Sequence, residues 1–114
     1  MAGERAALAY VTSRGWEVEA HRFRAGRHDV DLILRRGSLV AFVEVKTRGS
    51  TTYGHPIEAI GWRKRRSIAW AAAVWRDRFG RREDVFRFDV VAVRLRGRGK
   101  AEVNHLEDAW RLTG

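Results

Sequence analysis

The sequence predicts an α/β fold in which a mixed β-sheet is flanked by helices. Helical spacing of apolar residues occurs at the start of the chain and again in its middle. Three short apolar stretches rich in β-branched and aromatic residues lie between these helices, and a fourth follows the second helix. At 114 residues the chain can bury one hydrophobic core, so we expect residues 1–114 to form a single domain.

The first element is expected to be a helix over Gly3–Ser13, which contains good helix formers and which Gly15 can end. Leu8 and Val11 form its apolar stripe. Glu4 lies in the first turn, where the helix dipole favours an acidic side chain. On position alone, this interaction with the dipole is enough to explain Glu4.

Three strands are expected next. Residues 16–23 alternate between apolar and polar side chains, with Trp16, Val18 and Ala20 on one face. Residues 28–34 and 39–46 flank a turn at 35–38 and predict a β-hairpin. With residues 36 and 37 at the centre of the turn, residue 31 would pair with 42 and residue 29 with 44.

The second half of the chain predicts a crossover helix and further strands. A polar loop at 47–56, a candidate for a flap that contacts substrate, leads to a helix from Ile57 to about Phe79. This helix can place a strand at Val85–Leu95 beside the hairpin. A short strand at Ala101–Asn104 and one or two helical turns at Leu106–Leu112 are expected to close the chain.

The predicted hairpin carries charged residues inside apolar strands. Asp29 would lie opposite Glu44 with Asp31 on the diagonal, and Lys46 would share their face. Clustered carboxylates are costly unless a cation lies among them. Such a group suits metal-assisted phosphodiester hydrolysis, in which carboxylates hold Mg²⁺ or Mn²⁺ and a lysine orients water. The alternative is an ordinary salt bridge at a solvated strand end.

Composition favours a polyanionic partner. The net charge of +9 and pI near 11.3 indicate nucleic acid, unless they only reflect an arginine-rich proteome. The absence of cysteine excludes disulfides and cysteine-ligated zinc, and it fits a cytoplasmic location. No apolar run approaches the ~18 residues of a membrane span, and the first residues do not form a signal peptide.

With these elements in order, the chain resembles the YraN family of predicted endonucleases. That family is similar to archaeal Holliday-junction resolvases and is placed in the PD-(D/E)xK nuclease superfold. One departure is His28-Asp29 where the family usually has Gly-Glu, so His28 could contact a phosphate or crowd the site. The residues that match are Gly3 and Glu4, 29–33, 42–48, Gly54, 56–60, Lys64, Arg66 and 87–93.

The resemblance implies a restriction-endonuclease-like α-β-β-β-α-β core and assigns roles within it. Asp31, Glu44 and the Val45 carbonyl would bind Mg²⁺ or Mn²⁺, and Lys46 would be the catalytic lysine. Glu4 would reach the site from the first helix as a further ligand or base.

We therefore expect a metal-dependent endonuclease that acts on DNA, including branched or structured DNA. Two alternatives remain open: a nucleic-acid-binding module with a vestigial site, and an adaptor in a repair or recombination complex. A homodimer is plausible by resemblance, with Trp62 or Trp70 at the subunit contact, although core packing explains these tryptophans slightly better. The side chains expected to hold phosphates are Arg24, Arg48, Arg63, Lys64 and Arg66.

Overall fold

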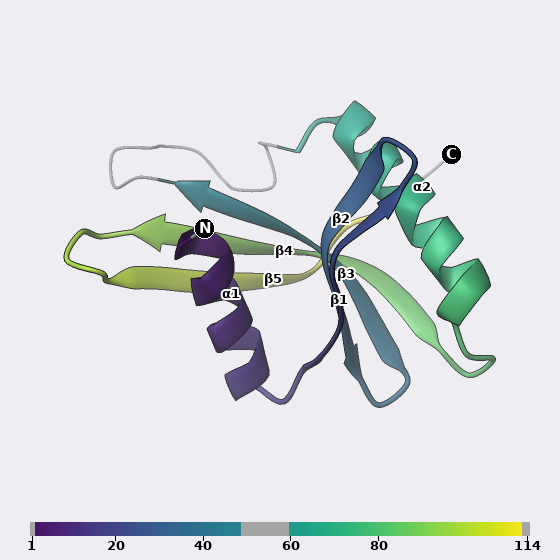
Figure 1. Cartoon of the computed structure of the whole chain (residues 1–114), viewed down its shortest axis with the longest axis horizontal. Coiled ribbons are helices and arrows are strands. Elements are labelled where there is room, and N and C mark those ends of the chain that lie inside the picture. Colours follow the sequence, from purple (N-terminus) through teal and green to yellow (C-terminus); the bar gives the residue numbers. More distant parts are fainter. Residues whose placement is uncertain (1, 49–59, 113–114) are drawn as a thin grey trace.

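The computed structural model describes residues 2–48 and 60–112. It confirms the predicted α/β class, with a five-stranded mixed sheet and two helices in the order α-β-β-β-α-β followed by a fifth strand (Figure 1). The elements are α1 (Ala2–Ser13), β1 (Glu17–Ala25), β2 (His28–Arg36), β3 (Leu39–Arg48), α2 (Trp62–Phe79), β4 (Val85–Leu95) and β5 (Ala101–Trp110).

The strands lie in the sheet in the same order as in the sequence. β1, β2 and β3 form an antiparallel meander, β4 runs parallel to β3, and β5 is antiparallel to β4. The parallel pair requires a crossover, which α2 provides. The predicted meander and crossover are therefore confirmed.

Two apolar cores lie on opposite faces of the sheet. On one face, α1 packs Ala7 and Val11 against strand residues that include Leu34. On the other, α2 packs Ile68 and Trp75 against residues such as Ile33 and Phe42. The central strands are covered on both faces, and this explains why their sequences are nearly continuous apolar runs.

The β2–β3 register differs from the predicted one by two residues. Arg36 pairs with Leu39, so the hairpin loop is Gly37-Ser38 and not Arg36-Gly37. Gly37 has φ +64°, and a turn with positive φ at its first central residue favours glycine there. The shift keeps every side chain on its predicted face but places Asp31, and not Asp29, across from Glu44.

The predicted C-terminal helix at Leu106–Leu112 is wrong, because β5 continues to Trp110. Asp89 of β4 is fully buried and accepts hydrogen bonds from the Asp108 backbone N–H at 2.9 Å and from Arg87. The rings of Trp110 and Phe88 are stacked with centroids 4.1 Å apart. Pairing with β4 thus outweighs the local helical preference of this segment.

Two other boundaries differ from the prediction. Helix α2 begins at Trp62, because Gly61 at its N-terminus has an extended conformation. Residues 57–59, like residues 49–56 of the predicted loop, lie outside the described residues, and Thr47 and Arg48 belong to β3.

The face predicted for β1 is only partly correct. The register with β2 shifts between Val18 and Ala20, which interrupts the alternation of faces along β1. As a result Trp16 belongs to the core under α1, whereas Ala20 packs against the core under α2, and Val18 is 39% exposed.

Candidate active site

Asp31 and Glu44 lie across from each other where β2 and β3 leave the hairpin ladder. The paired residues end at Leu32 and Val43, so Asp31 and Glu44 are the next opposed pair. By strand alternation, Asp31 shares a face with Ile33, and Glu44 shares a face with Phe42. That is the face covered by α2. The predicted meeting of these two carboxylates is therefore present, and it is more direct than the sequence suggested.

Burial makes this pair of acids electrostatically costly. Glu44 is 5% exposed, and its Oε2 has no hydrogen-bond partner among the described residues. Desolvation, followed by the neighbouring carboxylate of Asp31, raises the pKa of Glu44 to about 8. Asp31 Oδ2 accepts the backbone N–H of Val45 at 2.8 Å, and this bond fixes its orientation. Asp31 is thus anchored, while Glu44 Oε2 accepts no hydrogen bond from any described residue.

Two lysines lie close to the acids. Lys64, in the first turn of α2, places its Nζ 3.6 Å from Asp29 Oδ1 and 3.9 Å from Glu44 Oε2. The second distance allows ionic attraction but is too long for a hydrogen bond. Lys46 is half-buried on β3, on the face of Glu44, and its charge partly opposes the rise in the Glu44 pKa. The two lysines approach the acids from different elements.

Glu4 extends from α1 toward β1 and is paired there with Arg22 and His21. Its Oε1 accepts a hydrogen bond from Arg22 at 2.6 Å, and its Oε2 lies 3.1 Å from His21 Nε2. His21, with Arg22, lowers the pKa of the Glu4 carboxyl. Arg22 also lies 3.6 Å from Asp29 Oδ2, so it joins Glu4 to the charged cluster around Asp31 and Glu44.

The carboxylate oxygens of Asp31 and Glu44 are the type of ligand that a hard divalent cation prefers. Within residues 2–48 and 60–112, no three His, Asp or Glu side chains are arranged to enclose a metal ion. Mg²⁺, however, is commonly held by one or two carboxylates together with substrate phosphates and water. The unpartnered Oε2 of Glu44 beside the anchored Asp31 fits that pattern, because a cation there would satisfy a buried oxygen.

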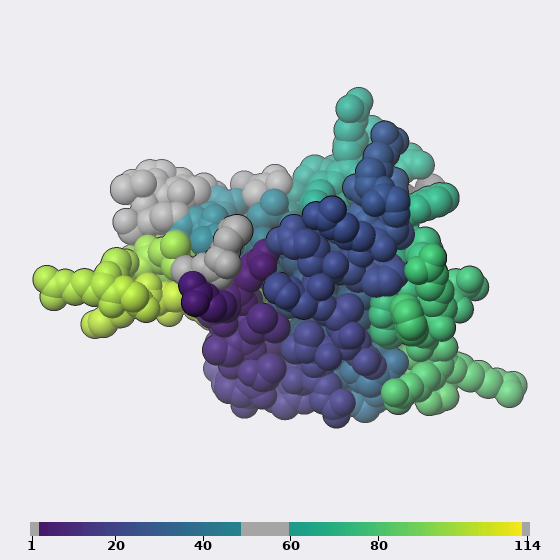
Figure 2. Space-filling model, viewed as in Figure 1, coloured from purple at the N-terminus to yellow at the C-terminus, as the bar shows by residue number. Residues whose placement is uncertain are grey.

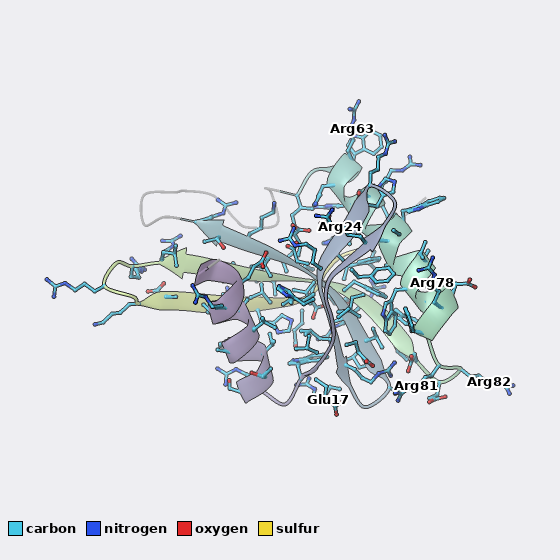
Figure 3. The ribbon with its side chains drawn as sticks, in the orientation of Figure 1. Glu17, Arg24, Arg63, Arg78, Arg81 and Arg82 are labelled. Carbon is cyan, nitrogen blue, oxygen red and sulfur yellow. The ribbon has the colours of Figure 1, made fainter. Side chains whose placement is uncertain are left out.

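The expected phosphate-binding residues do not all gather at the acids. Lys64 does, whereas Arg63 and Arg66 lie near the ring of Trp62, with guanidinium carbons 6.0 and 5.6 Å from its centroid. Arg24 is exposed on β1 and pairs with Asp29 in the β1–β2 ladder. In Figure 3 Arg63 projects from the start of α2 at the top of the view, and Arg24 lies below it, nearer the middle of the molecule. Arg48 lies at the end of β3.

His28 makes a contact that the sequence did not indicate. Its Nδ1 lies 2.8 Å from Ser67 Oγ of α2, and its ring centroid is 6.0 Å from that of Trp70. These contacts hold the start of β2 against α2. In Figure 2 the tip of the β1–β2 hairpin accordingly lies beside the first turns of α2.

Arg22 and His21 are the residues near the site whose interactions the sequence analysis missed. Arg22 has φ +54°, a conformation that arginine rarely adopts and that no sequence pattern predicts. Both residues follow the irregular part of β1, which turns side chains away from strict alternation and which the sequence does not reveal.

Comparisons with known proteins agree over most of the chain. A family model described as "Uncharacterised protein family UPF0102" matches residues 3–93. A UPF0102 protein from Rhodococcus jostii (strain RHA1) is 38% identical over 108 residues, covering 95% of this chain and 92% of the relative. One from Anaeromyxobacter sp. (strain Fw109-5) is 44% identical over 90 residues, covering 79% and 68%. One from Chlorobium phaeobacteroides is 33% identical, covering 95% and 89%. The chain therefore belongs to the UPF0102 family, the YraN family that its motifs indicated.

Proposed function

We propose that the protein is a Mg²⁺- or Mn²⁺-dependent endonuclease that hydrolyses phosphodiester bonds of DNA. The observation that carries this proposal is the pairing of Asp31 with buried Glu44, whose Oε2 has no hydrogen-bond partner among the described residues. Lys46 lies two residues beyond Glu44 on the same face, and Lys64 approaches from α2. The net charge of +9 provides the general attraction for a polyanion.

Each residue has a defined role in this proposal. Asp31, Glu44 and the Val45 carbonyl would hold the cation, which polarises the phosphoryl group and lowers the pKa of a bound water. Lys46 would orient the attacking water and stabilise charge on the phosphate in the transition state. Glu4 would serve as a further ligand or base once it exchanges its pairing with Arg22.

The basic residues would position the substrate. Lys64 would leave Glu44 and bind the scissile phosphate, while Arg24, Arg48, Arg63 and Arg66 would hold flanking phosphates. Such contacts do not read sequence, and they weaken steeply as salt rises. The proposal also includes a branched or structured DNA substrate and a homodimer that presents two sites to two strands. It places the protein in the cytoplasm. No helix within the described parts of the chain is long and apolar enough to cross a membrane.

Calorimetric titration of Mn²⁺ tests the site directly. Wild type should bind Mn²⁺, and the double variant Asp31→Asn, Glu44→Gln should not. Cleavage of labelled branched and linear DNA is then measured with Mg²⁺ or Mn²⁺, with Lys46→Met as a variant that should retain the fold and metal binding but lose turnover. Full cleavage by Lys46→Met would exclude a catalytic role for Lys46.

A non-catalytic nucleic-acid-binding module is the second candidate. The observation that favours it is the pairing of Glu4 with His21 and Arg22, which occupies both of its carboxylate oxygens. This alternative predicts DNA binding that is unchanged by Asp31→Asn and no cleavage with either metal. An adaptor in a repair or recombination complex would behave in the same way.

A further inference from the structure

Two of the five tryptophans lie on the solvent-facing side of α2. Trp62 is 62% exposed and Trp70 is 61% exposed, whereas Trp16, Trp75 and Trp110 are buried. Core packing, the explanation that the sequence slightly favoured, is therefore wrong for Trp62 and Trp70. Large aromatic side chains left exposed close together are typical of a binding surface.

Arginines lie between and beside these two rings. Arg63 and Arg66 approach the ring of Trp62, as described above, and Arg66 lies midway between the tryptophans in the sequence. Together with His28 and Ser67 they line an open pocket of about 580 Å³. We call Trp62, Arg63, Arg66 and Trp70 the tryptophan–arginine surface.

Charge identifies the kind of partner. Residues 63–66 are four consecutive basic residues, and Asp77 is the one acidic residue in 62–79. The first turn of α2 contains no acid, although the helix dipole there favours acids and disfavours cations. A cluster of cations in that position indicates an anionic partner.

We infer that the tryptophan–arginine surface binds an unpaired segment of nucleic acid, with bases stacked on Trp62 and Trp70 and phosphates held by Arg63 and Arg66. Eight helical residues span about 12 Å, comparable to three or four stacked nucleotide steps of about 3.4 Å. Aromatic rings interleaved with cations are the usual platform for single strands, because every base has a π-face. In an intact duplex these faces are already stacked and not accessible.

The surface is continuous with the candidate active site, and this extends the proposed function. Lys64 belongs to the same helical turns and contacts Asp29 and Glu44. A strand held on the outer face of α2 can therefore pass the N-terminal end of that helix toward the acids. For this connection alone the inference rests on the proposed function, and it implies substrates that combine paired and unpaired nucleotides.

A second copy of the chain fits this surface less well. In a two-fold dimer the same patch faces itself, so Arg63 and Arg66 would meet their own copies. Like charges placed opposite each other disfavour such an interface. Self-association is therefore the competing outcome in the test below.

The test measures binding in EDTA, so that metal binding and cleavage play no part. Fluorescence anisotropy is recorded with labelled oligodeoxyuridine, oligouridine and a DNA duplex of the same length. The variants are Trp62→Ala and Trp70→Ala, singly and together, and the double variant Trp62→Phe, Trp70→Phe. Phe79→Ala serves as the matched control, since Phe79 is 55% exposed at the other end of α2. Thermal unfolding verifies that each variant is folded, and light scattering gives its oligomeric state.

We expect each alanine substitution to weaken single-strand binding by about 5- to 150-fold. Phenylalanine should retain most of the affinity, Phe79→Ala should have little effect, and duplex binding, which depends on the unchanged arginines, should be the same in all variants. The tighter of the two single strands identifies the preferred sugar.

Three results would overturn the inference: unchanged single-strand binding in the double alanine variant, an equal loss for duplex and single strand, or conversion of a dimer to a monomer without loss of strand binding. The proposed function fails separately, if Mn²⁺ does not bind or DNA is not cleaved.

Discussion

Replacing Glu44 by glutamine should stabilise the metal-free protein at pH 8 and have a much smaller effect at pH 5. The folded structure raises the pKa of Glu44 from 4.5 to about 8 through burial and the nearby Asp31 carboxylate. Such a group binds its proton more tightly in the folded state, so stability falls as pH rises from 4.5 to about 8. Glutamine removes the charge, keeps the shape and can donate a hydrogen bond to Asp31.

The expected size follows from the difference between the two pKa values. At about 1.4 kcal/mol for each pKa unit, ionised Glu44 lowers the free energy of unfolding at pH 8 by at most about 4 kcal/mol. Local relaxation and entry of water reduce this penalty, so we expect Glu44→Gln to add about 1–3 kcal/mol at pH 8. At pH 5 Glu44 is protonated in the folded state but largely ionised in the unfolded state, so the change should be smaller, below about 1 kcal/mol.

The assay is urea unfolding followed by tryptophan fluorescence, in EDTA, at pH 5 and pH 8. Glu83→Gln is the matched control, because Glu83 is exposed and the same change of charge there should have little effect at either pH. Replacing EDTA by Mn²⁺ at pH 8 should stabilise wild type and not Glu44→Gln, since a ligand stabilises only the state that binds it. Equal destabilisation by Glu44→Gln at both pH values would refute the view that Glu44 is a costly buried acid.

Three further predictions concern residues outside the site. Arg35→Met should destabilise the fold by about 3–5 kcal/mol in urea unfolding, because Arg35 pairs with Glu19 and with Asp84 at 2.7 Å, and Asp84 has a fully buried side chain. Arg35 also lowers the pKa of Asp84 to about 2. This shift contributes about 2 kcal/mol to the free energy of unfolding above pH 5, and the contribution should be lost as pH falls from about 4 to about 2. Asp84→Asn should remove this part of the pH dependence of stability. Asp89→Ala should lower the unfolding temperature and increase hydrogen exchange at the Asp108 amide, because that N–H would lose its acceptor.

The strand pattern predicted most of the fold because the core is built from strong local signals. Apolar runs covered on both faces, such as those around Ile33 and Phe42, leave few alternatives to central strands. The C-terminal segment was different, since its conformation depends on buried Asp89 and on the stacking of Trp110 with Phe88. Both contacts come from a strand that is distant in sequence, so no local pattern could reveal them.

The interactions around the acids were less predictable than the acids themselves. Lys64 lies near Glu44 because of the way α2 crosses the sheet. Arg22 contacts Glu4 because its backbone in β1 has a positive φ. A sequence shows the type and spacing of these side chains but not the backbone irregularity that directs them. The contacts of charged residues at the edge of a site can therefore be determined only from a structure.

Asp31 and Glu44 lie on the same face of the sheet, as predicted, although the predicted hairpin register was wrong. The reason is physical. The predicted and observed registers differ by two residues, and side chains on a strand alternate with a period of two. A shift of two therefore changes which acid is opposite Glu44 and leaves all of them on one face. A shift of one would have moved Asp31 to the α1 face and separated the pair. Since the apolar residues that alternate with the acids have to face the two cores, burial alone excludes the one-residue shift. The core thus specifies that the acids share a face, and the glycine turn selects which two meet.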